Sequence, residues 1–202
     1  MKTKFFALAL LTGMFATISY AQVLNKREKK GQESTINEIK EQVPPMKTEA
    51  RASLDPYRYD ASKVTYFLYK PFTQRKEVEI YFFNSAEYKI AFQPGLVKDP
   101  IKVQVFDRPK DYKNRTLLFE KNGVSGGIFH TTSSELLGNL KSKKIEGGMA
   151  EAEAAILRLK KVYIDYIIPT KEKEVTVDPK TKQETIVRTK GAMIISMGYD
   201  NL

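Results

Sequence analysis

Two stretches of the chain decide its fold: Lys161 to Ile168, which reads KVYIDYII, and Ala192 to Tyr199, which reads AMIISMGY. Both are rich in the β-branched and aromatic residues that pack well on a pleated surface. In both, apolar side chains occupy successive positions, so they point to both faces of a strand. We therefore expect each stretch to be a central strand of a sheet.

Several other segments alternate between apolar and polar residues, which is typical of half-buried strands. Lys76 to Phe83 places Val78, Ile80 and Phe82 on one face, and Ile101 to Phe106 repeats the pattern. Further short strands are expected at residues 64–70, 87–92, 116–120 and 127–131.

Turn signals predict two hairpins. Asn84-Ser85 is expected to join the strand at 76–83 to the strand at 87–92. Glu172 to Val177 and Glu184 to Arg188 flank a turn that contains Pro179, and their polar faces predict a solvent-exposed hairpin that extends beyond the core.

The helical signals are few. Met149 to Leu159 is rich in Ala, Glu and Leu and contains no Gly or Pro, which predicts a helix. Ser133 to Lys144 is ambiguous. Short strands with turn signals and one short helix indicate an all-β fold over residues 55–202, mainly an antiparallel β-sandwich or jelly roll, preceded by a disordered N-terminal segment.

The first residues read as an export signal. Lys2 and Lys4 precede an apolar run from Phe5 to Ile18, and small residues at the end of this run predict cleavage after Ala21. The run is shorter than the roughly 20 residues that span a bilayer, so no transmembrane segment is expected in the mature chain. We expect a periplasmic or secreted protein.

Residues 22–54 are polar and mixed in charge. The apolar residues Ile36, Ile39 and Val43 are spaced as on one face of a short helix, which is expected over residues 34–42 and to end at Pro44-Pro45. So few apolar residues cannot offset the entropy of ordering the segment. The sequence therefore predicts a flexible charged linker.

The charge and the absence of cysteine limit the chemistry. The chain has no cysteine, which excludes disulfides and cysteine nucleophiles. Its net charge is +10, and removing Lys2 and Lys4 leaves +8. For an exported protein this favours anionic lipid headgroups, acidic glycans or an envelope protein complex over nucleic acid. The alternative is that the lysines only keep strand edges soluble.

The segment from Glu77 to Asp107, with its Tyr88-Lys89-Ile90-Ala91-Phe92 strand, resembles prepeptidase C-terminal-type modules, and so does the closing Tyr163-Ile164-Asp165-Tyr166 strand. The chain also resembles small exported β-sandwich proteins of Gram-negative envelopes. The resemblance implies a secreted jelly-roll domain with an accessory, non-catalytic role, and it carries no site residues.

The candidate binding residues are aromatic and basic. An aromatic cluster near the start of the domain could stack on sugars or hold a protein partner, and lysines further along could form a basic face. These residues are Tyr57, Tyr59, Tyr66, Tyr69, Lys141, Lys143 and Lys144. No catalytic residue, metal ligand or cofactor is expected.

Three features leave alternatives open. His130 is the only histidine, and a secreted hydrolase that uses it or a pair of carboxylates is the alternative function. Asp107, Asp111 and Asn114 could bind calcium, although basic residues between them favour a solvated loop. Asp165 lies among apolar residues, so either its pKa is perturbed or it forms a salt bridge.

Overall fold

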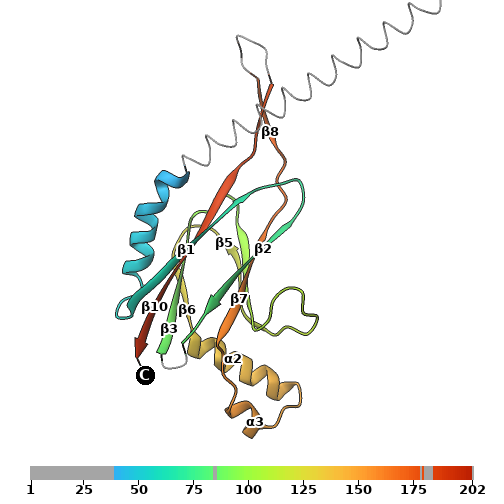
Figure 1. Ribbon diagram of the computed structural model, residues 1–202. Coiled ribbons are helices and arrows are strands. Elements are labelled where there is room, and N and C mark those ends of the chain that lie inside the picture. Colours follow the sequence, from blue (N-terminus) through green and yellow to red (C-terminus); the bar gives the residue numbers. More distant parts are fainter. Residues whose placement is uncertain (1–38, 84–85, 178, 180–183, 202) are drawn as a thin grey trace, which may run out of the picture.

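Figure 1 shows the computed structural model of the chain, which describes residues 39–83, 86–177, 179 and 184–201. Two four-stranded antiparallel sheets pack face to face, and helices lie on one face and at one end. The expected signal peptide (1–21), residues 22–38 of the expected linker and the Asn84-Ser85 turn lie outside the described residues.

The strands divide evenly between the two sheets. The first sheet has the order β1 (Arg58–Leu68), β10 (Lys190–Asn201), β3 (Ala86–Leu96) and β6 (Phe129–Thr132). The second sheet has the order β2 (Gln74–Tyr81), β7 (Lys161–Ile168), β4 (Ile101–Phe106) and β5 (Leu117–Val124). A separate two-stranded arm pairs β8 (Glu174–Val177) with β9 (Glu184–Val187).

This order is that of a jelly roll. If the arm is set aside and the other eight strands are renumbered along the chain, the sheets read 1-8-3-6 and 2-7-4-5. The predicted β-sandwich is confirmed. The two apolar stretches are both central strands, because β7 lies between β2 and β4 and β10 lies between β1 and β3.

One predicted pairing is wrong. Residues 76–83 and 87–92 do not form a hairpin, because β2 pairs with β7 in one sheet while β3 pairs with β10 and β6 in the other. The alternating pattern of each strand identifies a buried face but not the partner that lies beside it. The second predicted hairpin is present as the arm, which projects away from the sandwich (Figure 1).

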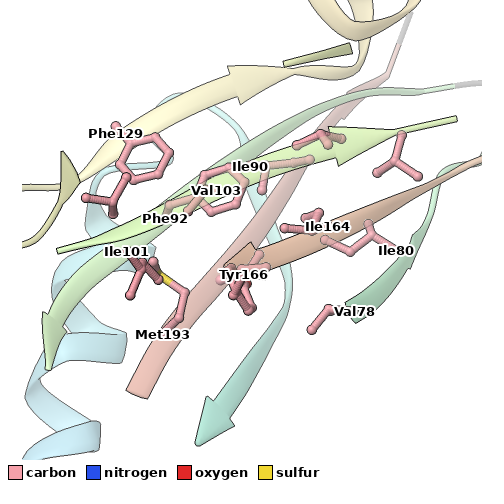
Figure 2. Close-up of a cluster of buried hydrophobic side chains, with 14 of the residues drawn as sticks. Val78, Ile80, Ile90, Phe92, Ile101, Val103, Phe129, Ile164, Tyr166 and Met193 are labelled. Atoms are coloured by element: carbon pink, nitrogen blue, oxygen red, sulfur yellow. The ribbon is translucent and has the colours of Figure 1, made fainter. Parts of the chain in front are cut away.

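The core fills the space between the two sheets (Figure 2). Val78 and Ile80 from β2 meet Ile164 and Tyr166 from β7, and all four are at most 4% exposed. On the other side of the core, Phe92 and Phe129 stack with their ring centroids 4.7 Å apart. With no cysteine in the chain, buried hydrocarbon and sheet hydrogen bonds hold the two sheets.

The helices differ from the prediction. The ambiguous segment is a full helix, α2 (Ser133–Glu146), which buries Leu136 and Leu140. Its start has a capping box: the Thr132 hydroxyl accepts from the Glu135 N–H at 3.1 Å, and the Glu135 carboxylate accepts from the Thr132 N–H at 2.9 Å. The predicted helix at 149–159 is reduced to α3 (Glu151–Ala155), which buries only Ala154 and so lacks an apolar face.

The end of the expected linker belongs to the folded body. Residues 39–52 are helical, and this N-terminal helix continues through Pro44-Pro45. Ile39 and Val43 are buried against Leu96, Ala192 and Ile194 on the outer face of the first sheet. The spacing of the buried positions continues to Ala50 and Leu54, each 0% exposed, so the apolar face is longer than the sequence analysis assumed.

Candidate binding site

A hollow of about 240 Å³ opens at the side of the sandwich where the edge strands of the two sheets meet. We call it the lysine hollow. Its lining residues come from the end of β1, the start of β2 and the start of β10: Tyr66, Phe67, Leu68, Lys70, Gln74, Lys76 and Lys190.

Long-range pairing places these residues together. Lys190 is the register partner of Leu68, which brings the first residue of β10 to the end of β1. Gln74 Nε2 donates to the carbonyl of Leu68 at 2.6 Å and so ties the start of β2 to the same point. Lys70 and Lys76 then flank the opening from the β1–β2 connection and from β2 itself.

The electrostatics of the lysine hollow favour an anion. Three lysines line it, and none of the lining residues in the described part of the chain is acidic. Lys190 is only 5% exposed, and burial lowers the pKa of its ammonium group.

Tyr66 adds an aromatic wall to the lysine hollow. It is 40% exposed, so its ring is available to a ligand that enters the opening. An aromatic face beside cationic groups can bind a molecule that combines a flat or apolar surface with a negative charge. Of the four tyrosines predicted as binding residues, Tyr66 is the one that lines this hollow.

The other predicted tyrosines lie elsewhere. Tyr59 stacks under Arg51, whose guanidinium carbon is 4.6 Å from the ring centroid. The ammonium of Lys89 lies 5.7 Å from the ring centroid of Tyr57, and burial, followed by Glu87, raises the pKa of the Tyr57 hydroxyl. Both lie near the start of β1, away from the lysine hollow.

The prediction that Tyr69 is a binding residue on the surface is wrong, because Tyr69 lies in the core. It is 1% exposed and packs edge-on against Phe67. Its hydroxyl donates to the carbonyl of Asp99 at 2.8 Å and accepts from the Asp99 N–H at 3.0 Å. Burial raises the pKa of this hydroxyl. Tyr69 therefore joins β1 to the β3–β4 connection.

The three lysines predicted to form a basic face instead make contacts with nearby parts of the chain. Lys141 donates to the carbonyl of Ala155 at 3.0 Å, and Lys143 donates to the carbonyl of Leu117 at 2.6 Å. The ammonium of Lys144 lies 3.9 Å from the carboxylate of Asp107. All three are on α2, at the opposite end of the sandwich from the lysine hollow (Figure 1). The structure therefore does not bring them together with Tyr66.

His130 contacts a serine. Its Nε2 lies 3.0 Å from Ser53 Oγ, and that hydroxyl donates its proton to the carbonyl of Ala50 at 2.8 Å. His130 therefore donates to Ser53 in this arrangement and does not act as its base. Burial, with a smaller contribution from Lys89, lowers the pKa of His130. Within the described part of the chain, no carboxylate forms an ion pair with His130 to orient it.

Asp165 forms the salt bridge that the sequence analysis left as an alternative. It is 0% exposed on the outer face of β7, and its carboxylate lies 2.8 Å from the guanidinium of Arg115. Arg75 approaches the same carboxylate at 3.5 Å. Arg115 also stacks over Phe106, with 3.6 Å between its guanidinium carbon and the ring centroid. This network fastens the connection between β4 and β5 onto the second sheet.

Asp107, the first of the three residues that could bind calcium, instead makes contacts in the connection between β4 and β5. Asp107 accepts from the N–H of Thr116, and Arg108 and Lys144 lie 3.9 Å from its other oxygen. Among the residues that the structure describes, no group of three or more His, Asp or Glu side chains is placed to hold a metal ion.

No protein-family model matches the chain, and no curated protein matches it. Among solved structures, a chain described under "CBM4 structure and function" is 12% identical, with a TM-score of 0.33, over 73% of this chain and 80% of that chain. A chain from "Bacillus endospore appendages form a novel family of disulfide-linked pili" is 7% identical, with a TM-score of 0.29, over 74% of this chain and 93% of that chain. Likenesses at these scores carry no inference about what this chain binds.

Over the described ranges, no helix is both long enough and apolar enough to cross a bilayer.

Proposed function

We propose that this chain is an exported, non-catalytic binding protein of a Gram-negative cell envelope, and that its lysine hollow takes up an anionic group of an envelope polymer. The observation that supports the proposal is the placement of three lysines and Tyr66 around one opening that no acidic residue lines among those the structure describes. Export rests on the signal-like N-terminus, and the envelope on the resemblance described above.

The size of the lysine hollow suggests how much of a polymer it holds. Its volume of about 240 Å³ is below the roughly 300–1,000 Å³ of sites that enclose a drug-sized ligand. A single acidic unit of a longer chain therefore fits the proposal better than an extended segment. Binding through lysine ammonium groups is expected to weaken as the salt concentration rises.

The test is a binding titration of the mature chain with alginate, an acidic polysaccharide, and with dextran as a neutral polymer. We expect alginate to bind, dextran not to bind, and Lys70→Gln and Lys76→Gln each to weaken alginate binding about tenfold. Lys121→Gln removes the same charge from exposed β5, outside the lysine hollow, and is the matched control. If Lys121→Gln has the same effect, or if the wild type does not bind alginate, the proposal is wrong.

A hydrolase that uses His130 is the second candidate, and the 3.0 Å contact between His130 and Ser53 is the observation that favours it. We expect Ser53 to be inert, because its proton is already donated to Ala50. Labelling of Ser53 by a fluorophosphonate probe that disappears in His130→Ala would establish the hydrolase instead.

A further inference from the structure

Among the residues that the structure describes, the three most exposed large apolar side chains lie at one end of the molecule. Ile156 is 72% exposed, Phe83 is 71% exposed and Tyr81 is 62% exposed. Tyr81 and Phe83 lie where β2 ends, and Ile156 directly follows α3. In Figure 1 the end of β2 leads to the same end of the sandwich as α2 and α3. We call Tyr81, Phe83 and Ile156 the apolar end.

Contacts between the two chain segments bring the end of β2 close to the residues that follow α3. Tyr81 is the register partner of Lys161, and the N–H of Phe82 donates to the carbonyl of Lys160 at 2.8 Å. Phe83 and Arg158 line the same hollow of about 340 Å³. The Arg158 guanidinium lies 3.4 Å from the carbonyl of Ile156. Two chain segments about 75 residues apart thus form one surface.

Basic residues lie beside the residues of the apolar end. In the described part of the chain, neither Arg158 nor Lys160 forms an ion pair, and both are exposed. Lys161 is paired with Glu79 at 2.8 Å, so these two charges cancel. The other nearby acidic residues are Glu87, which lines the hollow, and Glu151 and Glu153 on α3.

We propose that the apolar end docks on the surface of a membrane that contains anionic lipids. Exposed aromatic and aliphatic side chains beside Lys and Arg are the combination that inserts into the interface while the cations meet lipid phosphates. The charge of +8 that remains after removal of Lys2 and Lys4 adds long-range attraction to such a surface. This surface is separate from the lysine hollow, so the inference does not depend on polymer binding there.

The test is flotation of the protein (residues 22–202) with vesicles of phosphatidylcholine alone or of phosphatidylcholine with phosphatidylglycerol. We expect binding to the anionic vesicles and little to the neutral ones. Phe83→Ser and Ile156→Ser are each expected to weaken binding roughly tenfold. Arg158→Gln and Lys160→Gln are each expected to weaken it roughly fivefold. All four side chains are exposed, so thermal melting should show that the variants fold.

The control variant is Tyr112→Ser, which removes a ring that is 56% exposed outside the apolar end. The inference is overturned if the wild type does not float with anionic vesicles, or if Tyr112→Ser weakens binding as much as Phe83→Ser. It is also overturned if Lys70→Gln and Lys76→Gln abolish vesicle binding while Phe83→Ser and Ile156→Ser leave it unchanged, because the lysine hollow would then be the lipid site.

Discussion

Removing one partner of the buried ion pair between Arg115 and Asp165 is expected to destabilise the protein strongly, because the other charge would stay buried without it. Asp165 is 0% exposed, and Arg115 reaches it at 2.8 Å from the connection between β4 and β5. Arg115→Ala leaves the carboxylate buried with only Arg75, at 3.5 Å, and also removes the cation–π contact with Phe106. Breaking a buried pair by removing one partner costs about 3–5 kcal/mol.

Two further substitutions are expected to destabilise the protein less than Arg115→Ala. Asp165→Asn keeps the shape of the side chain and removes its charge, and Arg115 still has Glu77 at 3.8 Å, so we expect a loss of about 1–3 kcal/mol. Arg75 has a side chain that is 46% exposed, so Arg75→Ala is expected to cost less than about 1 kcal/mol.

The assay is equilibrium unfolding in urea followed by circular dichroism, with the slope m compared between variants. The expected order of destabilisation is Arg115→Ala, then Asp165→Asn, then Arg75→Ala. For a chain of this size, about 2–4 °C of melting temperature corresponds to each kcal/mol, so Arg115→Ala should melt about 6–20 °C lower. If Arg115→Ala costs no more than Arg75→Ala, water screens the pair and our reasoning about its burial is wrong.

Two other predictions concern His130 and the N-terminal helix. Because His130 is the only histidine, its imidazole resonances titrate without overlap, and we expect a midpoint below 6.5 by NMR. As the pH falls, His130 of the unfolded chain is protonated before His130 of the folded chain, so the free energy of unfolding decreases below about pH 6.5. His130→Gln should remove that part of the pH dependence. A titration midpoint above 6.5 would contradict the prediction that burial lowers the pKa of His130. Leu54→Ala empties a fully buried site under the helix and should cost about 2–5 kcal/mol in urea, whereas Ala52→Ser on the exposed side should cost less than about 0.5 kcal/mol. Equal values for the two would mean that the helix does not pack on the sheet.

Local patterns predicted the strands well. The predicted strands overlap β1 to β7 and β10, and the two apolar stretches are central as expected. Successive side chains of a strand point to opposite faces, so burial of one face appears as alternating apolar and polar residues over a few adjacent positions. The start of α2 also had a readable signal, since Thr132 and Glu135 have the spacing of a capping box.

The N-terminal helix shows where local reasoning failed. Pro44-Pro45 suggested that a helix would end there, and the few apolar residues suggested a linker. The decisive feature is the apolar outer face of the first sheet, where the helix buries Leu96, Ala192 and Ile194. The apolar spacing within residues 22–54 fits one face of a helix, but it does not identify the surface of the first sheet that covers this face.

By itself, the sequence determined which segments are strands, which two are central, and that no disulfide holds them. Only the tertiary structure decided which strands pair, that Arg115 neutralises Asp165, and that Tyr66, Lys76 and Lys190 surround one hollow. The physical reason is the range of the interactions. Burial periodicity acts over a few neighbouring residues, whereas strand pairing and side-chain clusters join residues far apart in the chain, whose distances in space no local pattern records.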